Sequence, residues 1–495
     1  MNTAIDSDYV FDLSQLPVEI VLKILALVDE RQPLANFPAG PSEDLLNLSL
    51  TNKFCYHYCR PLVWKSVRYR STTGTVTTPE FQRRRNLAQL LDLLNSSITS
   101  SHGPLPIRAL SFEPPRQFPT GLDGQAFLSA EFSSLCSILR ALARETTITS
   151  APLQILFFEG SENEMQNDMA HELLRAVLSL PMLEVLRLNS LYIQDSAWLS
   201  VLEHVPQLSK IKTLQIMHGS NRLGELLKFA PNVQSLLIWS HARAFWSLMD
   251  EIIERVPKLV KLSLDAVNQP SLFNHIAQAI EKVVESGAST PLDELFLEGS
   301  QTPEQRTRLL AALKRGAPLL RRLALYHVHM PMASFLHEVA DNLPDLESLA
   351  LVFGDCSAPM LWPDSLSDYA GALSRFRRLR FFAWDRLPPA FISDQMTTVA
   401  QINYDSFVVL AQAVPSLTEV VNIVQDVSEG STGWFGQIER IQARSTALAA
   451  KGTSGEKTNG ATRTQSRMTV KHETRKDFLI GLDHFVVLER DNHLI

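Results

Sequence analysis

Two histidine-containing groups in this chain carry side chains suited to metal binding. His171 and Glu172 open an apolar helical pattern as in a zinc-protease helix, but Arg175 occupies the position of the second histidine. An ordinary helix start is therefore the simpler interpretation. His327 and His329 lie on one side of a predicted strand end. Two histidines are an incomplete ligand set, so packing or solvent exposure is favoured over metal binding.

A third group, Cys55, His57 and Cys59, has the pattern Cys-x-His-x-Cys. On a helix the two cysteines share a face and His57 points away from it, which does not suit one tetrahedral zinc. Core cysteines are the favoured interpretation. The chain also lacks a Gly-rich phosphate loop and a Gly-x-Ser-x-Gly motif. We therefore expect no catalytic residue, no metal and no cofactor, in a protein that is not an enzyme.

The composition limits the class of protein. The chain has 495 residues, a formal charge of −7 and 45% apolar residues, which is enough for two or more domains and a large core. A mildly acidic chain lacks the basic stripe of a nucleic-acid-binding protein. Its four cysteines form no disulfide framework, which favours a reducing compartment.

The N-terminus and the apolar runs bear on localisation. Met1 to Asp12 is polar and acidic, so we expect no secretory signal. No apolar run approaches the ~18 residues of a membrane span. The sequence therefore predicts a soluble protein of the cytoplasm, the nucleus or both, with no nucleic-acid or membrane partner.

An apolar triplet, Leu-x-x-Leu-x-Leu, recurs along most of the chain. Its central residues are Leu156, Leu186, Leu214, Leu236, Leu262, Leu295, Leu323, Leu349 and Phe382, with weaker copies around Leu110 and Val420. The intervals from Leu156 to Phe382 are 30, 28, 22, 26, 33, 28, 26 and 33 residues. A period of about 20–29 residues indicates a leucine-rich repeat, and longer steps imply short insertions.

Helical patterns lie between the triplets. Apolar residues recur at three- and four-residue spacing in 171–180, 245–256, 272–284, 307–315 and 334–343. Pro181, Pro257, Pro318 and Pro344 then end the helix before the next triplet. We therefore predict an α/β fold, an irregular solenoid with parallel strands on its concave face and helices on its convex face. Such stacks bind partners more often than they catalyse.

A different unit, at about residues 13–70, precedes the repeats. Ser14 and Pro17 predict the start of a helix that runs to about Val28. Ser42 caps a second predicted helix, and a third spans about 54–60. Fewer than 60 residues cannot bury this much apolar surface internally, so we expect the unit to dock on another molecule.

The residues of this unit carry a family likeness. Leu16-Pro17-Val18-Glu19-Ile20, Leu48-Ser49-Leu50-Thr51 and Pro61-Leu62-Val63-Trp64 resemble an F-box. Together with the repeats, the chain resembles an F-box/leucine-rich-repeat protein of fungal type. The F-box likeness covers about 55 residues, and the repeat likeness covers about 320.

This resemblance implies a substrate adaptor. In the family, the F-box docks on the adaptor subunit of a cullin–RING ubiquitin ligase, and the repeats present a protein substrate. The matching positions imply that the docking residues are Leu16, Pro17, Ile20, Leu48, Leu50 and Trp64. A non-degradative scaffold and a regulator such as a GTPase activator remain alternatives, although no isolated loop arginine suits the latter.

The sequence divides the chain into five parts. We expect a disordered N-terminus (1–12), the F-box (13–70), a linker helix region (71–104), the solenoid (105–425) and a flexible basic tail (426–495). Within the tail, 450–466 is predicted to be disordered by its polar composition, and 484–488 to form a possible terminal strand.

Side chains on the strand face away from the inward leucines are the candidates for substrate binding. Because strand residues alternate between faces, the residues between and beside those leucines point outward. Aromatic anchors and acidic neighbours among them predict a binding patch made of Trp239, Phe296, Tyr326, Asp265 and Glu298. The alternative is that loops or the C-terminal segment cover some of these side chains.

Overall fold

The structure is a computed structural model of the whole chain. It describes residues 16–28, 43–51, 53–70, 87, 90–96, 105–113, 122–145, 153–159, 167–189, 201, 208–217, 223–239, 252–265, 271–299, 301–326, 328, 332–352, 363–385, 399–426, 430–443 and 463–474. The chain forms two compact units, Met1–Phe245 and Trp246–Ile495, which we describe separately as unit 1 and unit 2.

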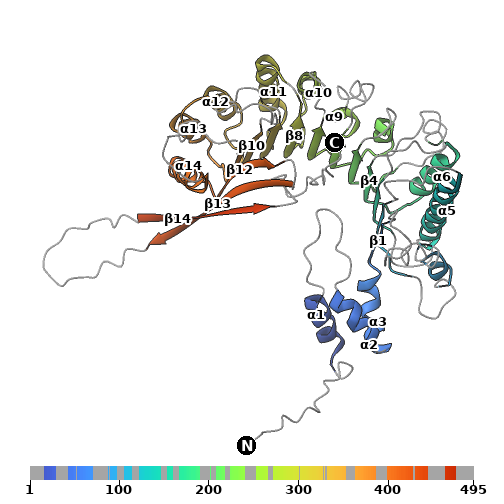
Figure 1. Cartoon of the computed structure of the whole chain (residues 1–495). Helices are drawn as coiled ribbons and strands as arrows, with labels where there is room; N and C mark the ends of the chain where they lie inside the picture. Colours follow the sequence, from blue (N-terminus) through green and yellow to red (C-terminus); the bar gives the residue numbers. More distant parts are fainter. Residues whose placement is uncertain are drawn as a thin grey trace, which may run out of the picture. The chain divides into compact units, whose positions relative to one another are not determined.

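Unit 1 starts with three helices and continues as strands that alternate with helices (Figure 1). Its elements are α1 (Val18–Val28), α2 (Glu43–Thr51), α3 (Lys53–Val63), β1 (Ser66–Arg70), β2 (Ala109–Glu113), α5 (Leu122–Glu145), β3 (Ile155–Glu159), α6 (Asn167–Leu178), β4 (Val185–Asn189), β5 (Thr213–Met217), the 3-10 helix η2 (Leu223–Lys228) and β6 (Ser235–Trp239). Strands β1 to β6 pair in chain order, and every pair is parallel.

Unit 2 repeats the same alternation. Its elements are α9 (Ile252–Arg255), β7 (Lys261–Asp265), α10 (Leu272–Glu285), β8 (Glu294–Glu298), α11 (Pro303–Gly316), β9 (Arg322–Tyr326), α12 (Ala333–Asn342), β10 (Ser348–Val352), α13 (Leu366–Leu373), β11 (Phe381–Asp385), α14 (Val399–Ala413), β12 (Glu419–Asp426), β13 (Gly430–Ala443) and β14 (Arg463–Thr474). Strands β7 to β12 pair in parallel, whereas β13 and β14 add an antiparallel hairpin to the edge.

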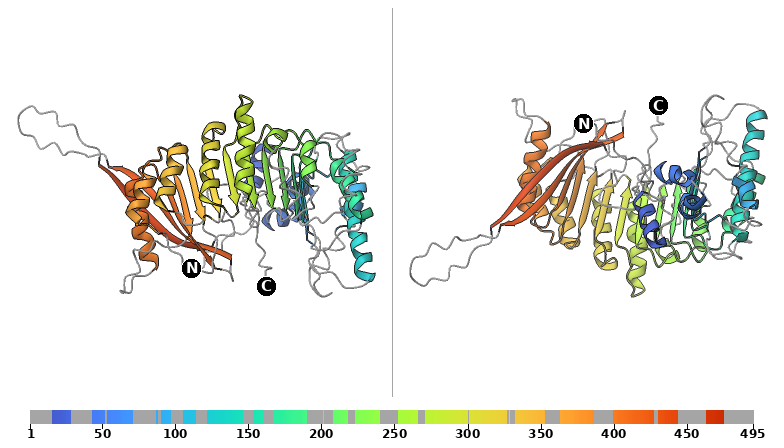
Figure 2. Two further views of the ribbon diagram at one scale, coloured as in Figure 1. Left: turned by 90° about the horizontal axis from the view of Figure 1, so that it is seen from above. Right: turned by 90° about the horizontal axis from the view of Figure 1, so that it is seen from below.

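Each apolar triplet builds one strand of the sheet. In β8, Leu295 and Leu297 are completely buried, and Leu292, just before the strand, is 1% exposed. The leucines of each strand share one face, and the helices that alternate with the strands of each unit lie on one side of them (Figure 2). This arrangement confirms the predicted α/β class, with parallel strands on one side and helices on the other. We call the strand face on the other side the helix-free face.

A repeated hydrogen-bond pattern joins neighbouring strands at their starts. The carbonyl oxygen before a strand accepts hydrogen bonds from two consecutive N–H groups of the next repeat. The Asp293 oxygen accepts from Arg321 and Arg322, at 2.9 and 3.0 Å, and the Arg321 oxygen accepts from Glu347 and Ser348, at 2.8 and 3.1 Å. These bonds satisfy the hydrogen-bonding groups of the backbone where each strand begins.

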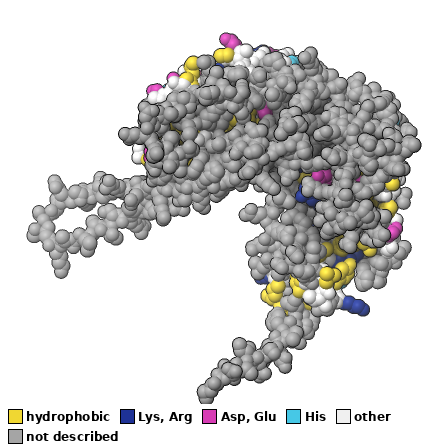
Figure 3. Space-filling view, viewed as in Figure 1, with side chains coloured by type: hydrophobic (Ala, Val, Ile, Leu, Met, Phe, Trp, Pro, Cys, Tyr) yellow, Lys and Arg dark blue, Asp and Glu magenta, His cyan; other side chains and the backbone are white. Residues whose placement is uncertain are grey.

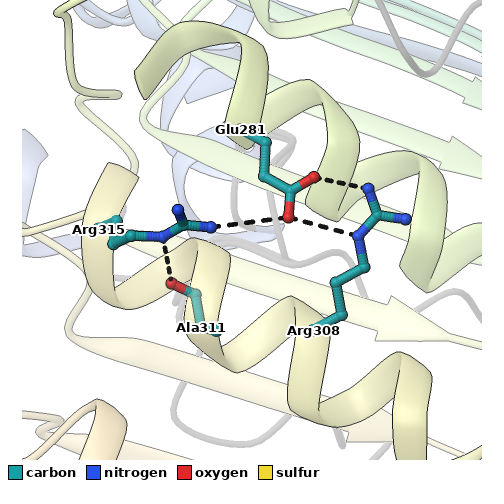
Figure 4. Close-up of polar contacts among 4 residues, drawn as sticks. All are labelled: Glu281, Arg308, Ala311 and Arg315. Carbon is teal, nitrogen blue, oxygen red and sulfur yellow. Dashed lines mark hydrogen bonds and ion pairs between the residues drawn. The ribbon is translucent and has the colours of Figure 1, made fainter. Parts of the chain in front are cut away.

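Helices α10 and α11 show how neighbouring repeats pack. Gly316, the last residue of α11, lies so close to α10 that an added Cβ would sit 2.4 Å from Ile280 Cγ2. On the surface, the Glu281 carboxylate pairs with Arg308, at 2.6 Å, and with Arg315, at 3.7 Å (Figure 4). Arg315 also donates to the carbonyl oxygen of Ala311. The apolar contact therefore fixes the spacing of the helices, and the exposed ion pairs add little to it.

Residues in the predicted F-box and tail ranges form strands of the sheet. Residues 66–70, in the range assigned to the F-box, form β1 and pair with β2. The range predicted to be a flexible tail contains β13 and β14. Residues 463–466, which we expected to be disordered, belong to β14, whereas 450–462 and the predicted strand at 484–488 lie outside the described residues. Of the described helices, none combines the length and apolarity that crossing a membrane requires.

Candidate functional site

The helices α1, α2 and α3 pack around a small apolar core. Val21 and Leu25 of α1 meet Leu45 of α2 and Cys59 of α3, and each of these four side chains is at most 2% exposed. The i, i+4 spacing of Val21 and Leu25 places both on one face of α1. Partly buried hydrophobic residues pack around this centre: Leu16, Leu48, Phe54, Tyr58, Leu62 and Val63. We call these three helices and their core the three-helix unit.

The outer surface of the three-helix unit is unusually apolar. Val18 is 44% exposed, Ile20 41%, Tyr56 46% and Leu50 81%. These are four of the seven large hydrophobic side chains that are exposed among the described residues, although the unit is a small part of the chain. Figure 3 shows hydrophobic side chains at the surface over this segment, with basic side chains beside them. The exposed large apolar side chains of the described residues are thus concentrated on this unit.

The structure separates the predicted docking residues into two groups. Pro17, Ile20 and Leu50 are exposed and available to a partner. Leu16 and Leu48 instead pack against the core of the unit, so they support its fold. Val18 and Tyr56 were not predicted. Tyr56 directly follows the buried Cys55, about 100° further around the helix, and so lies at the edge of the stripe formed by Cys55 and Cys59.

Trp64 belongs to the first repeat by its spacing. Trp64, Val67 and Tyr69 have the same intervals as a Leu-x-x-Leu-x-Leu triplet, and β1 pairs Val67 with Leu110 and Tyr69 with Phe112. The Tyr69 ring stacks on the Phe112 ring with centroids 5.4 Å apart. The side chain of Trp64 is partly buried. Its place in the triplet of the first repeat therefore accounts for its apolar character.

The cysteine–histidine group of α3 is divided between the core and the surface. Cys55 and Cys59 are buried, while His57 is exposed and meets the Tyr58 ring edge-on at 5.3 Å. Burial, and secondarily the neighbouring Cys55, raise the pKa of the Cys59 thiol to about 11. The thiol therefore stays protonated at neutral pH, which makes it a poor nucleophile and a poor metal ligand.

The other histidine groups give no metal site in the described part of the chain. Glu172 forms an ion pair of 2.6 Å with Arg140 of α5, so it links α5 and α6. No cluster of three or more His, Cys, Asp or Glu residues suited to a metal occurs among the described residues. His327 and His329 lie outside the described residues.

The predicted substrate residues of unit 2 lie on the helix-free face, but two of them are buried. Phe296 is 3% exposed and Glu298 is 6% exposed, whereas Tyr326 is partly exposed. The rings of Phe296 and Tyr326 meet at 4.8 Å between centroids, tilted by 50°. The expected exposure of Phe296 is therefore not found, because its ring packs inside the protein.

Asp265 and Trp239 are placed by their strands alone. Asp265 ends β7 and pairs in register with Glu298, and Trp239 ends β6 in unit 1. The side chains of both lie outside the described residues. Strand register therefore brings together Asp265, Glu298 and Tyr326 across β7, β8 and β9, while Trp239 belongs to the other unit.

A buried carboxylate on the helix-free face binds two basic side chains. Glu294 is completely buried, and its Oε1 lies 2.9 Å from Lys261 Nζ and 3.0 Å from Arg322 Nη2. The three residues start β7, β8 and β9 and pair in register. The contact among these three residues was not predicted from the sequence. All three residues occupy the same position in successive triplets, directly before the central leucine, and this shared position could have predicted that they are neighbours.

Comparison with known proteins adds remote structural likeness but no family. No family model matches the chain, and no curated protein matches its sequence. Among solved structures, the yeast complex of Rad7 and Elc1 contains a chain similar to this one at 14% identity, over 68% of this chain and 82% of that chain, with a TM-score of 0.37. A likeness this remote indicates no function for the chain.

Proposed function

We propose that this protein is a non-catalytic substrate adaptor of a cullin–RING ubiquitin ligase. The three-helix unit docks on the adaptor subunit of the ligase, and the repeats present a protein substrate. The observation that carries the proposal is the concentration of exposed apolar side chains, Val18, Ile20, Leu50 and Tyr56, on the unit whose sequence resembles an F-box.

The three-helix unit has a small apolar core. Its core fully buries only a few side chains, while Leu50 keeps 81% of its surface in contact with solvent. Apolar surface of this kind is stabilised when a partner covers it, and helices commonly place such side chains in an apolar groove. Ile20 and Leu50 are the best anchors because they match the motif and are exposed.

The connection between the two parts fits an adaptor. Helix α3 ends at Val63 and β1 begins at Ser66, so only two residues separate the docking helices from the first repeat strand. A docked ligase subunit would therefore be attached directly to the repeat array. The array offers strand faces and loops for a substrate, as stacked repeats do.

The experiment is affinity purification of the tagged full-length chain, with identification of bound proteins. The proposal expects a cullin and its adaptor subunit to be recovered with the wild-type chain and lost with Ile20→Asp and Leu50→Asp together. Leu319→Asp is the matched control, because Leu319 is 55% exposed but lies in unit 2. Equal recovery with all three chains would contradict the docking assignment.

A second measurement separates the adaptor from a non-degradative scaffold. Both bind the ligase subunit, but only the adaptor shortens the lifetime of a bound protein. The proposal expects a co-purified protein to be stabilised by the Ile20→Asp, Leu50→Asp chain and by inhibition of ubiquitin transfer. An unchanged lifetime in both cases would favour the scaffold.

A further inference from the structure

Helix α3 presents basic side chains on the surface of the three-helix unit. Lys53, His57 and Arg60 are four and three residues apart, so they lie on one side of the helix. Lys53 and His57 are exposed, and Arg60 is partly exposed. Cys55 and Cys59 point to the other side of the helix and are buried in the core. We call Lys53, His57 and Arg60 the basic face of α3.

Exposed apolar side chains lie beside this basic face. Tyr56 comes three residues after Lys53 and four before Arg60, so it neighbours both of them on the helix surface. Leu50, which is also exposed, precedes Lys53 by three residues near the end of α2. Figure 3 shows hydrophobic and basic side chains together over this segment. A partner that covers Tyr56 therefore also meets Lys53 and Arg60.

The sequence around α3 is basic and contains no acidic residue. Between Asp44 and Glu80 there is no aspartate or glutamate, although the whole chain has a formal charge of −7. The same stretch contains five basic residues: Lys53, Arg60, Lys65, Arg68 and Arg70. Lys65 and Arg68 are exposed. The positive charge of α3 thus continues along the chain into β1.

The acidic residues of the three-helix unit lie on the other two helices. Glu19 is in the first turn of α1, and Lys23, of opposite charge, lies one turn further along that helix. Glu43 and Asp44 begin α2, about 9 Å along the helix from Leu50 near its end. The acidic residues are thus confined to α1 and to the start of α2.

We propose that the partner of the three-helix unit carries acidic side chains around the apolar groove that receives Ile20, Leu50 and Tyr56. This inference rests on the proposed function and deepens it, because it states the chemistry of the ligase subunit that can bind. Carboxylates at the rim of that groove face the basic face of α3 and form charge-assisted contacts with Lys53 and Arg60.

An acidic protein fits this face better than a nucleic acid does. Proteins that bind nucleic acids gather many cations along a groove, whereas the basic face of α3 has only Lys53, Arg60 and a histidine. Its exposed neighbour Leu50 and the exposed Ile20 are aliphatic, so they offer no ring on which a base could stack.

The basic face acts mainly on the rate of association. Exposed charges at the rim of an interface attract a partner of opposite sign before contact, while apolar anchors determine how slowly the complex dissociates. A ligase subunit whose groove has a basic rim meets like charge and is disfavoured. Selection among related ligase subunits therefore depends on Lys53 and Arg60 as well as on apolar fit.

The test compares two charge-reversed chains in stopped-flow association with the purified adaptor subunit of a cullin–RING ligase. One full-length chain carries Lys53→Glu and Arg60→Glu. The control carries Arg377→Glu and Arg378→Glu at exposed positions of unit 2, so both chains have the same net charge. We expect the basic-face variant to associate roughly tenfold more slowly than the control at about 50 mM salt, and the difference to shrink at about 500 mM. Dissociation rates should differ much less.

A milder variant covers the case in which charge reversal disturbs the fold, which circular dichroism and melting temperature detect. Lys53→Gln with Arg60→Gln removes the charge without reversing it and should give an intermediate association rate. Equal association rates in folded basic-face and control chains would overturn the inference and leave the proposed function intact. No binding by the wild type would overturn both. Wild-type binding to a short DNA duplex, lost in the basic-face variant, would assign the face to nucleic acid and overturn the inference.

Discussion

The carbonyl oxygen of Lys65 accepts a 3.0 Å hydrogen bond from the backbone N–H of Ala109. It also accepts one from Arg108, and this is the same two-donor pattern that joins the Asp293 and Arg321 carbonyl oxygens to the repeats that follow them. The first repeat strand therefore begins directly after the three-helix unit. A partner bound to α1–α3 is connected to the sheet through Trp64 and Lys65.

The inward leucines should carry most of the stability of the repeats. Leu323 is 1% exposed, so Leu323→Ala removes buried apolar volume and leaves a cavity. We expect the free energy of unfolding to fall by roughly 2–5 kcal/mol, measured by urea denaturation. Leu319→Ala, at a position that is 55% exposed, should change it by less than about 0.5 kcal/mol. Similar effects of the two substitutions would mean that the face assignment is incorrect.

A side chain at position 316 should destabilise the packing of α10 against α11. Gly316→Ala places a Cβ 2.4 Å from Ile280 Cγ2 and 2.9 Å from Val284 Cγ2, so α10 and α11 must move apart. We expect a loss of about 1–3 kcal/mol in the free energy of unfolding. Gly371→Ala in α13 is the matched control, since nothing lies within 4 Å of its Cβ. That change should stabilise the protein by up to about 1 kcal/mol through helix propensity, and a loss there would contradict the packing described.

The ion pairs of Glu294 and Glu281 should differ in strength. Glu294→Ala leaves Lys261 and Arg322 without their shared carboxylate on a buried face, whereas Glu281 lies at the surface. We expect a destabilisation of roughly 3 kcal/mol for Glu294→Ala and less than about 1 kcal/mol for Glu281→Ala, by chemical denaturation. In 1 M salt the effect of Glu281→Ala should shrink further, and that of Glu294→Ala should persist. Equal losses of stability for the two variants would show that the Glu294 carboxylate is solvated.

Stability should fall at alkaline pH partly because of Tyr369. Burial raises the pKa of Tyr369 from 10.0 to about 12, and its hydroxyl accepts a hydrogen bond from the Asp364 N–H. Above pH 10 the unfolded chain releases this proton while the folded chain retains it, so unfolding is favoured as pH rises toward 12. The difference in stability between wild type and Tyr369→Phe should therefore decrease between pH 9.5 and 11.5. A constant difference over that range would mean that the hydroxyl ionises as easily in the folded protein as in the unfolded one.

The repeated strands were predictable because one local pattern specifies each of them. Leu295 and Leu297 alternate with residues on the other face, and a proline or turn precedes each triplet, so position and face follow from spacing. The first strand was missed because Trp64, Val67 and Tyr69 replace the leucines. The hairpin β13–β14 was not predicted because its residues follow the last triplet and do not repeat the triplet pattern. Pairing at the edge of a sheet is only weakly specified by the local sequence.

The exposure of candidate site residues was less predictable than their position. Phe296 was placed on the correct face, but whether a side chain on that face meets solvent depends on tertiary packing above it. Leu16 and Leu48 likewise match the docking motif, yet they pack against Leu25 and its neighbours because a small three-helix unit needs them for its core. A match to the motif therefore does not show whether an apolar side chain packs in the core of the unit or lies exposed for a partner.

The most direct test of the proposed function measures binding between the purified full-length chain and the adaptor subunit of a cullin–RING ligase. Isothermal titration calorimetry compares three proteins: the wild type, the Ile20→Asp, Leu50→Asp double variant, and the Leu319→Asp control. The control also replaces an exposed apolar side chain with aspartate, but outside the three-helix unit. Two central anchors should be worth at least about 2 kcal/mol each, or more than a hundredfold in affinity together. We predict that the double variant loses binding while Leu319→Asp retains it. Unchanged affinity in a folded double variant, or no binding by the wild type, would contradict the account.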